Sequence, residues 1–153
     1  MPNQQLIHRS VEIDASPSAV WAVVSDLRRM GEWSPQCRRM FVRGGPVGLG
    51  TRTLNLNGQG RLRWPTNAKV VAFEPERRLA FRILENRTVW TFELEPTATG
   101  TRVTESRSTP KGVSGLSNVL TQKVLGGTRD FEAGLDKGIA QTLERIKLEA
   151  ERA

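Results

Sequence analysis

Hydrophobic and polar residues alternate near the start of the chain in the pattern of a β-strand with one buried face. Ile7, Val11 and Ile13 occupy odd positions, whereas polar residues occupy the even positions from 8 to 14. Successive side chains of a strand point to opposite sides of a sheet. The alternation therefore predicts a strand over residues 7–15 whose odd-numbered side faces a core.

A helix is predicted directly after this strand. Ser16 can accept a hydrogen bond at the N-cap, and Pro17 fits the first helical position, where its missing N–H would have no partner. The apolar run 19–24 continues the helix. A second helical turn is predicted over 27–31. The segment 33–35 should end this turn, because it closes with Pro35 and the residue before a proline avoids the helical conformation.

Residues 37–109 predict successive antiparallel strands. Runs rich in strand-forming residues alternate with turns rich in Gly, Pro and Asn. The predicted strands span 51–56, 69–73, 79–84, 88–94 and 101–109, and the predicted turns lie at 44–48, 57–58, 74–76, 85–86 and 96–100. These turns are too short for helical crossovers, so neighbouring strands should pair antiparallel. Pro65 predicts a bulge or break in the strand that contains it.

The last forty or so residues follow a helical period. Their apolar positions fall on one helical face, namely Leu116, Leu120, Val124, Phe131, Leu135, Ile139, Leu143, Ile146 and Ala150. This spacing predicts a long amphipathic C-terminal helix. The pair Gly126-Gly127 followed by Thr128 predicts a kink or a new N-cap within this region.

Length and composition predict a single domain over residues 1–153. The chain has 37% hydrophobic residues, enough at this length for a core of its own. Cys37 is the only cysteine, so no internal disulfide can form, and its strand position favours an inert buried thiol. No charged-then-apolar leader opens the chain, and every apolar run is shorter than the roughly 18 residues of a membrane span. We expect a cytoplasmic protein.

The formal net charge of +7 suggests nucleic acid or anionic lipid at first sight. However, the basic pairs 28–29, 38–39 and 77–78 lie far apart in the sequence, and acidic residues are interleaved throughout. No recognition helix or base-stacking motif is present. We therefore expect the basic residues not to cluster, and nucleic acid is disfavoured as a partner.

The order of one strand, two short helices, antiparallel strands and a long C-terminal helix resembles the α+β helix-grip fold of the START and birch-pollen-allergen (SRPBCC) superfamily. The closest resemblance is to its bacterial polyketide cyclase/dehydrase and lipid-transport group. It rests on VEIDASPSAVWAVVSDL at 11–27, EWSP at 32–35, GLGTR at 48–52, FEPERRLAF at 73–81, WTFELEP at 90–96 and GTRVT at 100–104. The resemblance implies a curved antiparallel sheet that wraps the long helix and leaves an apolar cavity. Members bind lipids, sterols, polyketides or plant hormones there, and a minority catalyse cyclisation or dehydration.

Nine residues are predicted to contact a ligand in that cavity. Aromatic side chains on the sheet could stack on a flat ligand or simply form core, and Trp33 suits the cavity mouth. Glu105 and Arg107 share parity with Val103, so they could form a charge pair facing the cavity or a structural ion pair at the rim. The full predicted set is Trp33, Asn55, Arg63, Trp64, Phe81, Trp90, Phe92, Glu105 and Arg107.

The residues offer little sign of catalysis. The chain contains no tyrosine, a residue that cyclases of this superfamily place in the pocket, and the sole histidine, His8, has outward parity on its strand. No nucleophile–base set and no metal-ligand spacing is present, so we expect no metal and no cofactor.

The favoured interpretation is therefore binding or transport of a hydrophobic small molecule, with residues 110–115 as a gate. One alternative is a polyketide cyclase or dehydratase in which Arg63, Glu105 and Arg107 polarise the substrate. The other is a protein- or RNA-interaction module of the same fold.

Overall fold

The computed structural model of the protein describes residues 6–109 and 128–152, and the side chains of residues 7–109 and 134–152. The elements run in the order β1 (Leu6–Ile13), α1 (Pro17–Val24), the 3-10 turn η1 (Leu27–Arg29), α2 (Met30–Trp33), β2 (Cys37–Val42), β3 (Arg52–Gln59), β4 (Leu62–Glu74), β5 (Arg78–Ile83), β6 (Val89–Pro96), β7 (Thr101–Ser108) and α4 (Thr128–Arg152). This is the α+β order expected from the sequence.

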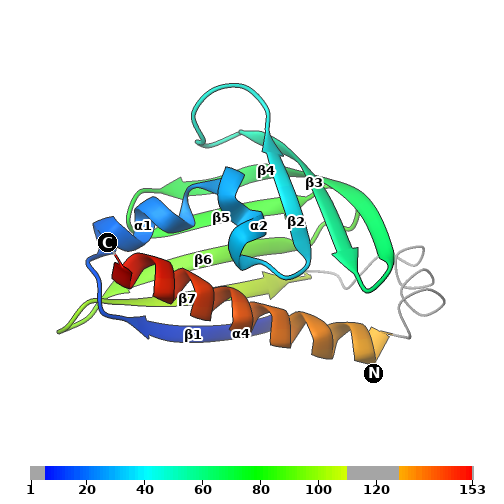
Figure 1. Cartoon of the computed structure of the whole chain (residues 1–153). Coiled ribbons are helices and arrows are strands. Elements are labelled where there is room, and N and C mark those ends of the chain that lie inside the picture. The colour runs from blue at the N-terminus through cyan, green and yellow to red at the C-terminus, as the bar shows by residue number, and fades with distance from the viewer. Residues whose placement is uncertain (1–5, 110–127, 153) are drawn as a thin grey trace.

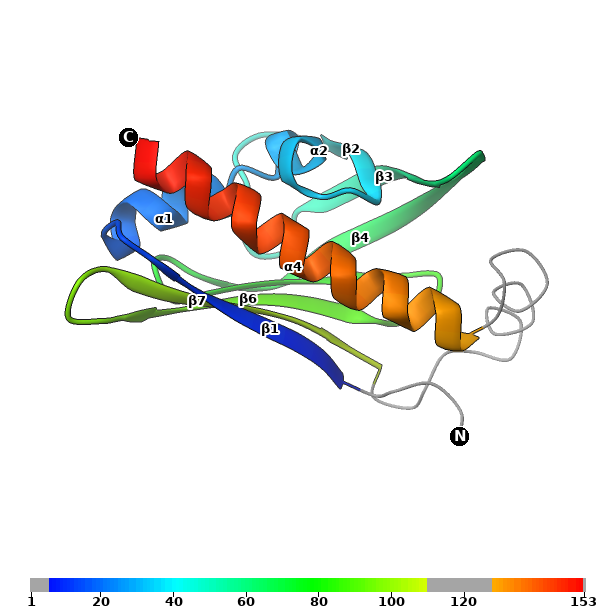
Figure 2. The same cartoon turned by 60° about the horizontal axis from the view of Figure 1, so that its bottom comes forward.

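The strands form one antiparallel sheet in the order β1-β7-β6-β5-β4-β3-β2. Figure 1 shows the sheet curving around α4, and Figure 2 shows α4 lying across the concave face with α1 and α2 beside it. A sheet that grips one long helix in this way is the helix-grip fold. β1 and β2 are the two edge strands of the sheet.

The core lies between α4 and the concave face of the sheet. The predicted apolar stripe of α4 is buried there at Leu135, Ile139, Leu143, Ile146 and Ala150, as the helical spacing requires. The other residues of the predicted stripe, at 116, 120 and 124 and the side chain at 131, lie outside the described residues, as does the Gly126-Gly127 pair. No helix within the described ranges is long and apolar enough to span a bilayer.

Local signals at the N-terminal end are confirmed. Ser16 Oγ accepts a hydrogen bond from the backbone N–H of Ala19 at 3.2 Å, and Pro17 is the first residue of α1. The second helical segment, predicted over 27–31, extends through η1 and α2 to Trp33. His8 is exposed on the outer side of β1, as its parity predicts.

One prediction for the strands is wrong, and another is right only in part. The turn expected at Asn57-Gly58 is part of β3, which continues to Gln59, and the chain reverses at Gly60, whose φ of 61° favours glycine. Pro65 causes no break, because β4 pairs with β5 only from Ala68 onward. At Pro65 the strand is hydrogen-bonded on one side only, a position where proline is tolerated. The bulge of β4 lies instead between residues 70 and 72.

Candidate functional site

A small pocket lies on the concave side of the sheet, between the sheet and the α2–β2 segment. Its volume is about 70 Å³. We call it the inner pocket, and it is lined by Met30, Ser34, Gln36, Cys37, Met40, Asn55, Asn57, Phe81, Ile83, Trp90 and Glu105. Most of its wall therefore comes from β2, β3 and the strands β5 to β7, with both apolar and polar side chains.

The alternation of β7 directs Glu105 into this pocket. Thr101, Val103, Glu105 and Arg107 are all buried, and the residues between them are more exposed. Glu105 is 5% exposed and Arg107 is 4% exposed, as the parity with Val103 predicts. The concave face of β7 therefore carries two ionisable side chains inside the protein.

Glu105 is a buried carboxyl group without a hydrogen-bond partner on Oε1 in the described part of the chain. Its cross-strand neighbours are Phe92 on β6 and Arg9 on β1, and Arg9 is engaged with Asp136 of α4 at 2.8 Å. Burial raises the pKa of Glu105 well above its ordinary value, because low polarity disfavours the charged form. The carboxyl group is thus held toward its neutral, hydrogen-bond-donating state.

Glu105 and Arg107 do not form the charge pair that the sequence suggested. No ion pair between them is found among residues 6–109 and 128–152, and Arg107 does not line the inner pocket. Residues two apart on a strand lie side by side on one face without their charged ends having to meet. Among the described residues that line the pocket, Glu105 is the only one with a carboxyl group, and none has a basic side chain.

Asn55 and Asn57 form a polar wall of the inner pocket on β3. The Asn55 Oδ1 atom accepts a hydrogen bond from Thr53 Oγ1 at 2.8 Å, and Asn55 Nδ2 donates to Thr66 Oγ1 at 3.3 Å. Asn57 Nδ2 donates to the same Thr66 hydroxyl at 2.9 Å. These bonds fix both carboxamides, so the pocket has rigid polar groups as well as an unsatisfied acid.

The structure separates the predicted ligand-contact residues into two groups. Asn55, Phe81, Trp90 and Glu105 line the inner pocket. The remaining five are not among its lining residues. Trp33 and Phe92 are buried in the core, Arg107 is buried on β7, Trp64 is half-buried on β4, and Arg63 is exposed.

Arg63 lies outside the cavity, contrary to expectation. It pairs in register with Gly58, and its guanidinium lies over that glycine and donates to the carbonyl oxygens of Gly60 and Leu62, each at 2.8 Å. Its parity on β4 is opposite to that of Trp64, so its side chain points to the convex face. Arg63 is therefore a hairpin residue in this fold.

Sequence reasoning missed several lining residues. Asn57 shares the parity of Asn55 and could have been found from it, but it was placed in a turn. Ser34 and Gln36 follow α2 in a short irregular segment, where no periodic pattern shows which side a residue faces. Cys37 also lines the pocket, and burial raises its thiol pKa to about 12, so the thiol is protonated and unreactive at neutral pH.

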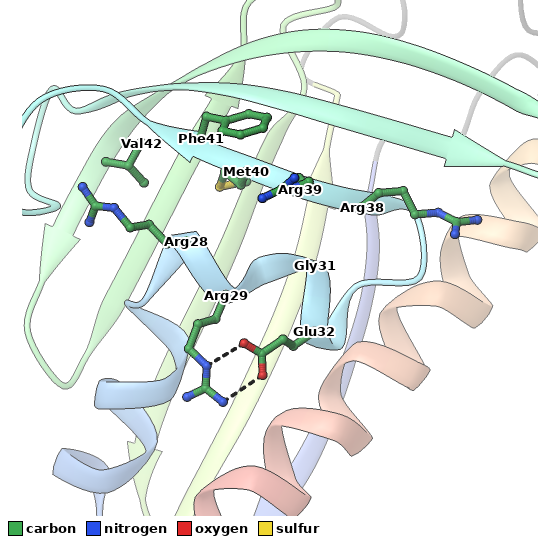
Figure 3. Close-up of a pocket in the computed structure, with 9 residues that line it drawn as sticks. All are labelled: Arg28, Arg29, Gly31, Glu32, Arg38, Arg39, Met40, Phe41 and Val42. Atoms are coloured by element: carbon green, nitrogen blue, oxygen red, sulfur yellow. Dashed lines mark hydrogen bonds and ion pairs between the residues drawn. The ribbon is translucent and has the colours of Figure 1, made fainter.

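A second, larger hollow lies beside the edge strand β2 (Figure 3). Its volume is about 540 Å³. We call it the arginine groove, and it is lined by Arg28, Arg29, Gly31, Glu32, Arg38, Arg39, Met40, Phe41 and Val42. The expectation that the basic residues do not cluster is wrong here, because the fold packs η1 and α2 against β2 and brings two basic pairs together.

No group of three or more His, Cys, Asp or Glu side chains able to hold a metal ion occurs in the described residues. The predicted gate at 110–115 lies outside them. The described side chains of the inner pocket offer hydrogen bonding and apolar contact.

Comparison with solved structures supports the fold. A polyketide-cyclase-like protein from Corynebacterium glutamicum is 28% identical, with a TM-score of 0.68 over 99% of this chain and 96% of that chain. An aromatase/cyclase from a Streptomyces species is 16% identical, with a TM-score of 0.78 over 96% of this chain and 93% of that one. A di-domain aromatase/cyclase from the steffimycin biosynthetic pathway is 10% identical, with a TM-score of 0.77, and 97% of this chain matches 51% of its length.

No functionally curated protein matches the chain in sequence. A sequence model of one family, described as polyketide cyclase/dehydrase and lipid transport, matches residues 4–151. This match covers the strand, the capped helix, the sheet and the long helix described above. The chain therefore belongs to the polyketide cyclase/dehydrase and lipid transport family.

Proposed function

We propose that the protein binds a hydrophobic small molecule, of lipid or polyketide type, in the inner pocket. The observation that carries this proposal is a pocket on the concave side of the sheet with apolar and aromatic walls and a few polar groups, among them Asn55 and Glu105. Ligand sites in proteins commonly have this composition. The description of the family supports the same class of ligand.

Apolar contact supplies the affinity in this proposal, and the polar groups supply orientation. Burial of apolar surface contributes about 25 cal/mol per Å². An unsatisfied buried polar group costs about 1–3 kcal/mol, so a ligand that bonds to Glu105 recovers part of that cost. A ligand carbonyl or hydroxyl group placed beside Glu105 is therefore favoured over a purely hydrocarbon ligand.

The inner pocket must widen to accept such a ligand. Its volume of about 70 Å³ is well below the roughly 300–1,000 Å³ of typical ligand sites. Met30 and Met40 line it, and both are buried. Unbranched methionine side chains adapt readily to new shapes, so the ligand enters by displacing these two side chains.

Catalysis of the cyclase kind is not favoured by this arrangement. Of the three polarising residues expected of such an enzyme, only Glu105 lines the inner pocket, and Arg63 is exposed on the convex face. The pocket is better suited to hold a ligand than to polarise it from several sides.

Titration with phenylnaphthylamine, a neutral apolar dye whose fluorescence rises on burial, tests the proposal. We expect saturable binding to the wild-type protein. In a Cys37→Phe variant, which fills the inner pocket, the affinity should fall at least about tenfold. Ser106→Phe adds the same ring to the half-buried, convex side of β7 and should leave the affinity unchanged.

Native mass spectrometry of the wild-type protein provides a second measurement, independent of the stability of either variant. A retained apolar ligand is expected in protein purified from cells. Absence of both dye binding and a retained ligand would overturn the proposal. Equal dye binding by Cys37→Phe and the wild type would move the site away from the inner pocket.

A further inference from the structure

The arginine groove contains the guanidinium groups of Arg28, Arg29, Arg38 and Arg39. Within the described ranges, Arg28, Arg38 and Arg39 form no ion pair. The fourth arginine, Arg29, differs because it bonds to Glu32 at 2.8 Å and to Glu149 at 3.0 Å. With respect to the described residues, the groove therefore carries three positive charges without an acidic partner, and charges of one sign repel one another.

Apolar side chains lie among these charges. Phe41 is 46% exposed, and the guanidinium of Arg39 lies 5.2 Å from the centre of its ring. Met40 and Val42 complete an apolar strip along β2. Figure 3 shows Arg28 reaching out from η1 on the side of Val42, and Arg39 and then Arg38 following one another along β2 on the opposite side of Met40. A ligand of the groove would meet both guanidinium groups and apolar surface.

Met40 is the one lining residue that the arginine groove and the inner pocket share. It is 4% exposed and stands between the two hollows. Its thioether side chain can change rotamer at small cost. Movement of this single side chain would therefore join a groove of about 540 Å³ to a pocket of about 70 Å³.

We infer that the arginine groove holds the anionic head group of an amphiphilic ligand, a carboxylate or a phosphate, whose apolar body passes Met40 into the inner pocket. Guanidinium groups bind both kinds of head group through paired hydrogen bonds. This inference rests on the proposed function, and it narrows the ligand from any hydrophobic molecule to an acidic amphiphile.

Calorimetric titration with dodecanoate, dodecyl phosphate and dodecanol tests it, because the three share one chain and differ in the head group. We expect at least one of the anions to bind the wild-type protein about tenfold or more tightly than dodecanol. A triple variant, Arg28→Gln with Arg38→Gln and Arg39→Gln, should lose this preference. Its unchanged affinity for dodecanol would show that the fold and the inner pocket are intact.

A matched control removes three charges elsewhere. Arg52, Lys69 and Arg82 are exposed, lie opposite one another across β3, β4 and β5, and form no ion pair within the described ranges. Replacing all three with Gln lowers the net charge by the same amount and should leave the anion preference intact.

The outcomes separate the two proposals. Equal binding of anions and dodecanol by the wild type, or an equal loss of preference in both triple variants, would overturn the inference and leave the proposed function standing. Binding of none of the three probes would overturn both.

Discussion

Protonation of Glu105 is coupled to folding, because its carboxyl group is buried in the folded protein. It lies on the concave face of β7 between Phe92 and Arg9, with Arg107 two positions further along the strand. Arg9 is bonded to Asp136, and desolvation raises the pKa of Glu105 in the folded protein. The folded state therefore retains a proton that the unfolded chain releases once the pH exceeds about 4.3, the ordinary pKa of glutamate.

Replacing Glu105 with Gln should remove this coupling. Above about pH 4.3, Glu105 lowers the free energy of unfolding of the wild-type protein as the pH rises. The decrease is up to about 1.4 kcal/mol per pH unit, and it ends once the pH exceeds the pKa of Glu105 in the folded protein. The stability of Glu105→Gln relative to the wild type should therefore increase with pH across this window. Urea unfolding from pH 4 to pH 8 measures the difference.

Glu93→Gln is the matched control, because Glu93 is exposed on the convex side of β6. It removes an exposed carboxyl group and should not gain stability relative to the wild type as the pH rises. A difference between Glu105→Gln and the wild type that stays constant with pH would contradict the assignment of a raised pKa to Glu105.

At the scale of elements, the contact of α2 with β2 shapes both hollows. It depends on Gly31, because a Cβ atom there would overlap the backbone carbonyl oxygen of Arg38. Backbone atoms of a strand cannot move aside as the end of a flexible side chain can. The absence of a side chain at Gly31 thus sets how closely the wall of the arginine groove approaches the sheet edge.

Gly31→Ala should lower the free energy of unfolding by about 1–3 kcal/mol, the usual cost of overpacking. Gly45→Ala is the control, since a Cβ atom at Gly45 would meet nothing within 4 Å. That variant should be unchanged or more stable by up to about 1 kcal/mol, because alanine restricts the unfolded chain. Chemical denaturation measures both, and equal effects at the two sites would refute the role given to Gly31.

The elements themselves were largely predictable from the sequence, since the N-cap of α1, the strands and the apolar stripe of α4 are local patterns. Register and pairing were not. Pro65 is tolerated because of where β5 begins to pair, and Asn57 belongs to β3 because the hairpin closes at Gly60. Neither fact is contained in the neighbouring residues.

The candidate site was predictable only in part for the same reason. Parity with Val103 placed Glu105 correctly on the concave face, and Asn55, Phe81 and Trp90 of the predicted set also line the inner pocket. The arginine groove forms only when residues 28–29 and 38–39 are brought together by the packing of α2 on β2. The sequence pattern within each segment does not predict such a contact between segments.

For the molecule as a whole, the two hollows act as one binding path if Met40 controls the passage between them. The edge strand β2 then has the inner pocket on one side and the solvent-facing groove on the other, with Met40 lining both. Association of an apolar ligand would be limited by the movement of this side chain rather than by diffusion.

Met40→Ala should therefore speed association of phenylnaphthylamine by about tenfold, which corresponds to an activation barrier for entry lower by about 1.4 kcal/mol. The same variant should lose about 2–5 kcal/mol in the free energy of unfolding. Leu79→Ala, a truncation of a buried β5 side chain that lines neither hollow, should cost similar stability without changing the rate. Met40→Leu keeps the volume and should associate close to the wild-type rate. Stopped-flow fluorescence measures all three, with circular dichroism confirming that each variant is folded. Equal association rates for folded Met40→Ala and the wild type would place the route into the inner pocket elsewhere. Shortening the side chain at position 40 would then have left the rate-limiting step of ligand entry unchanged.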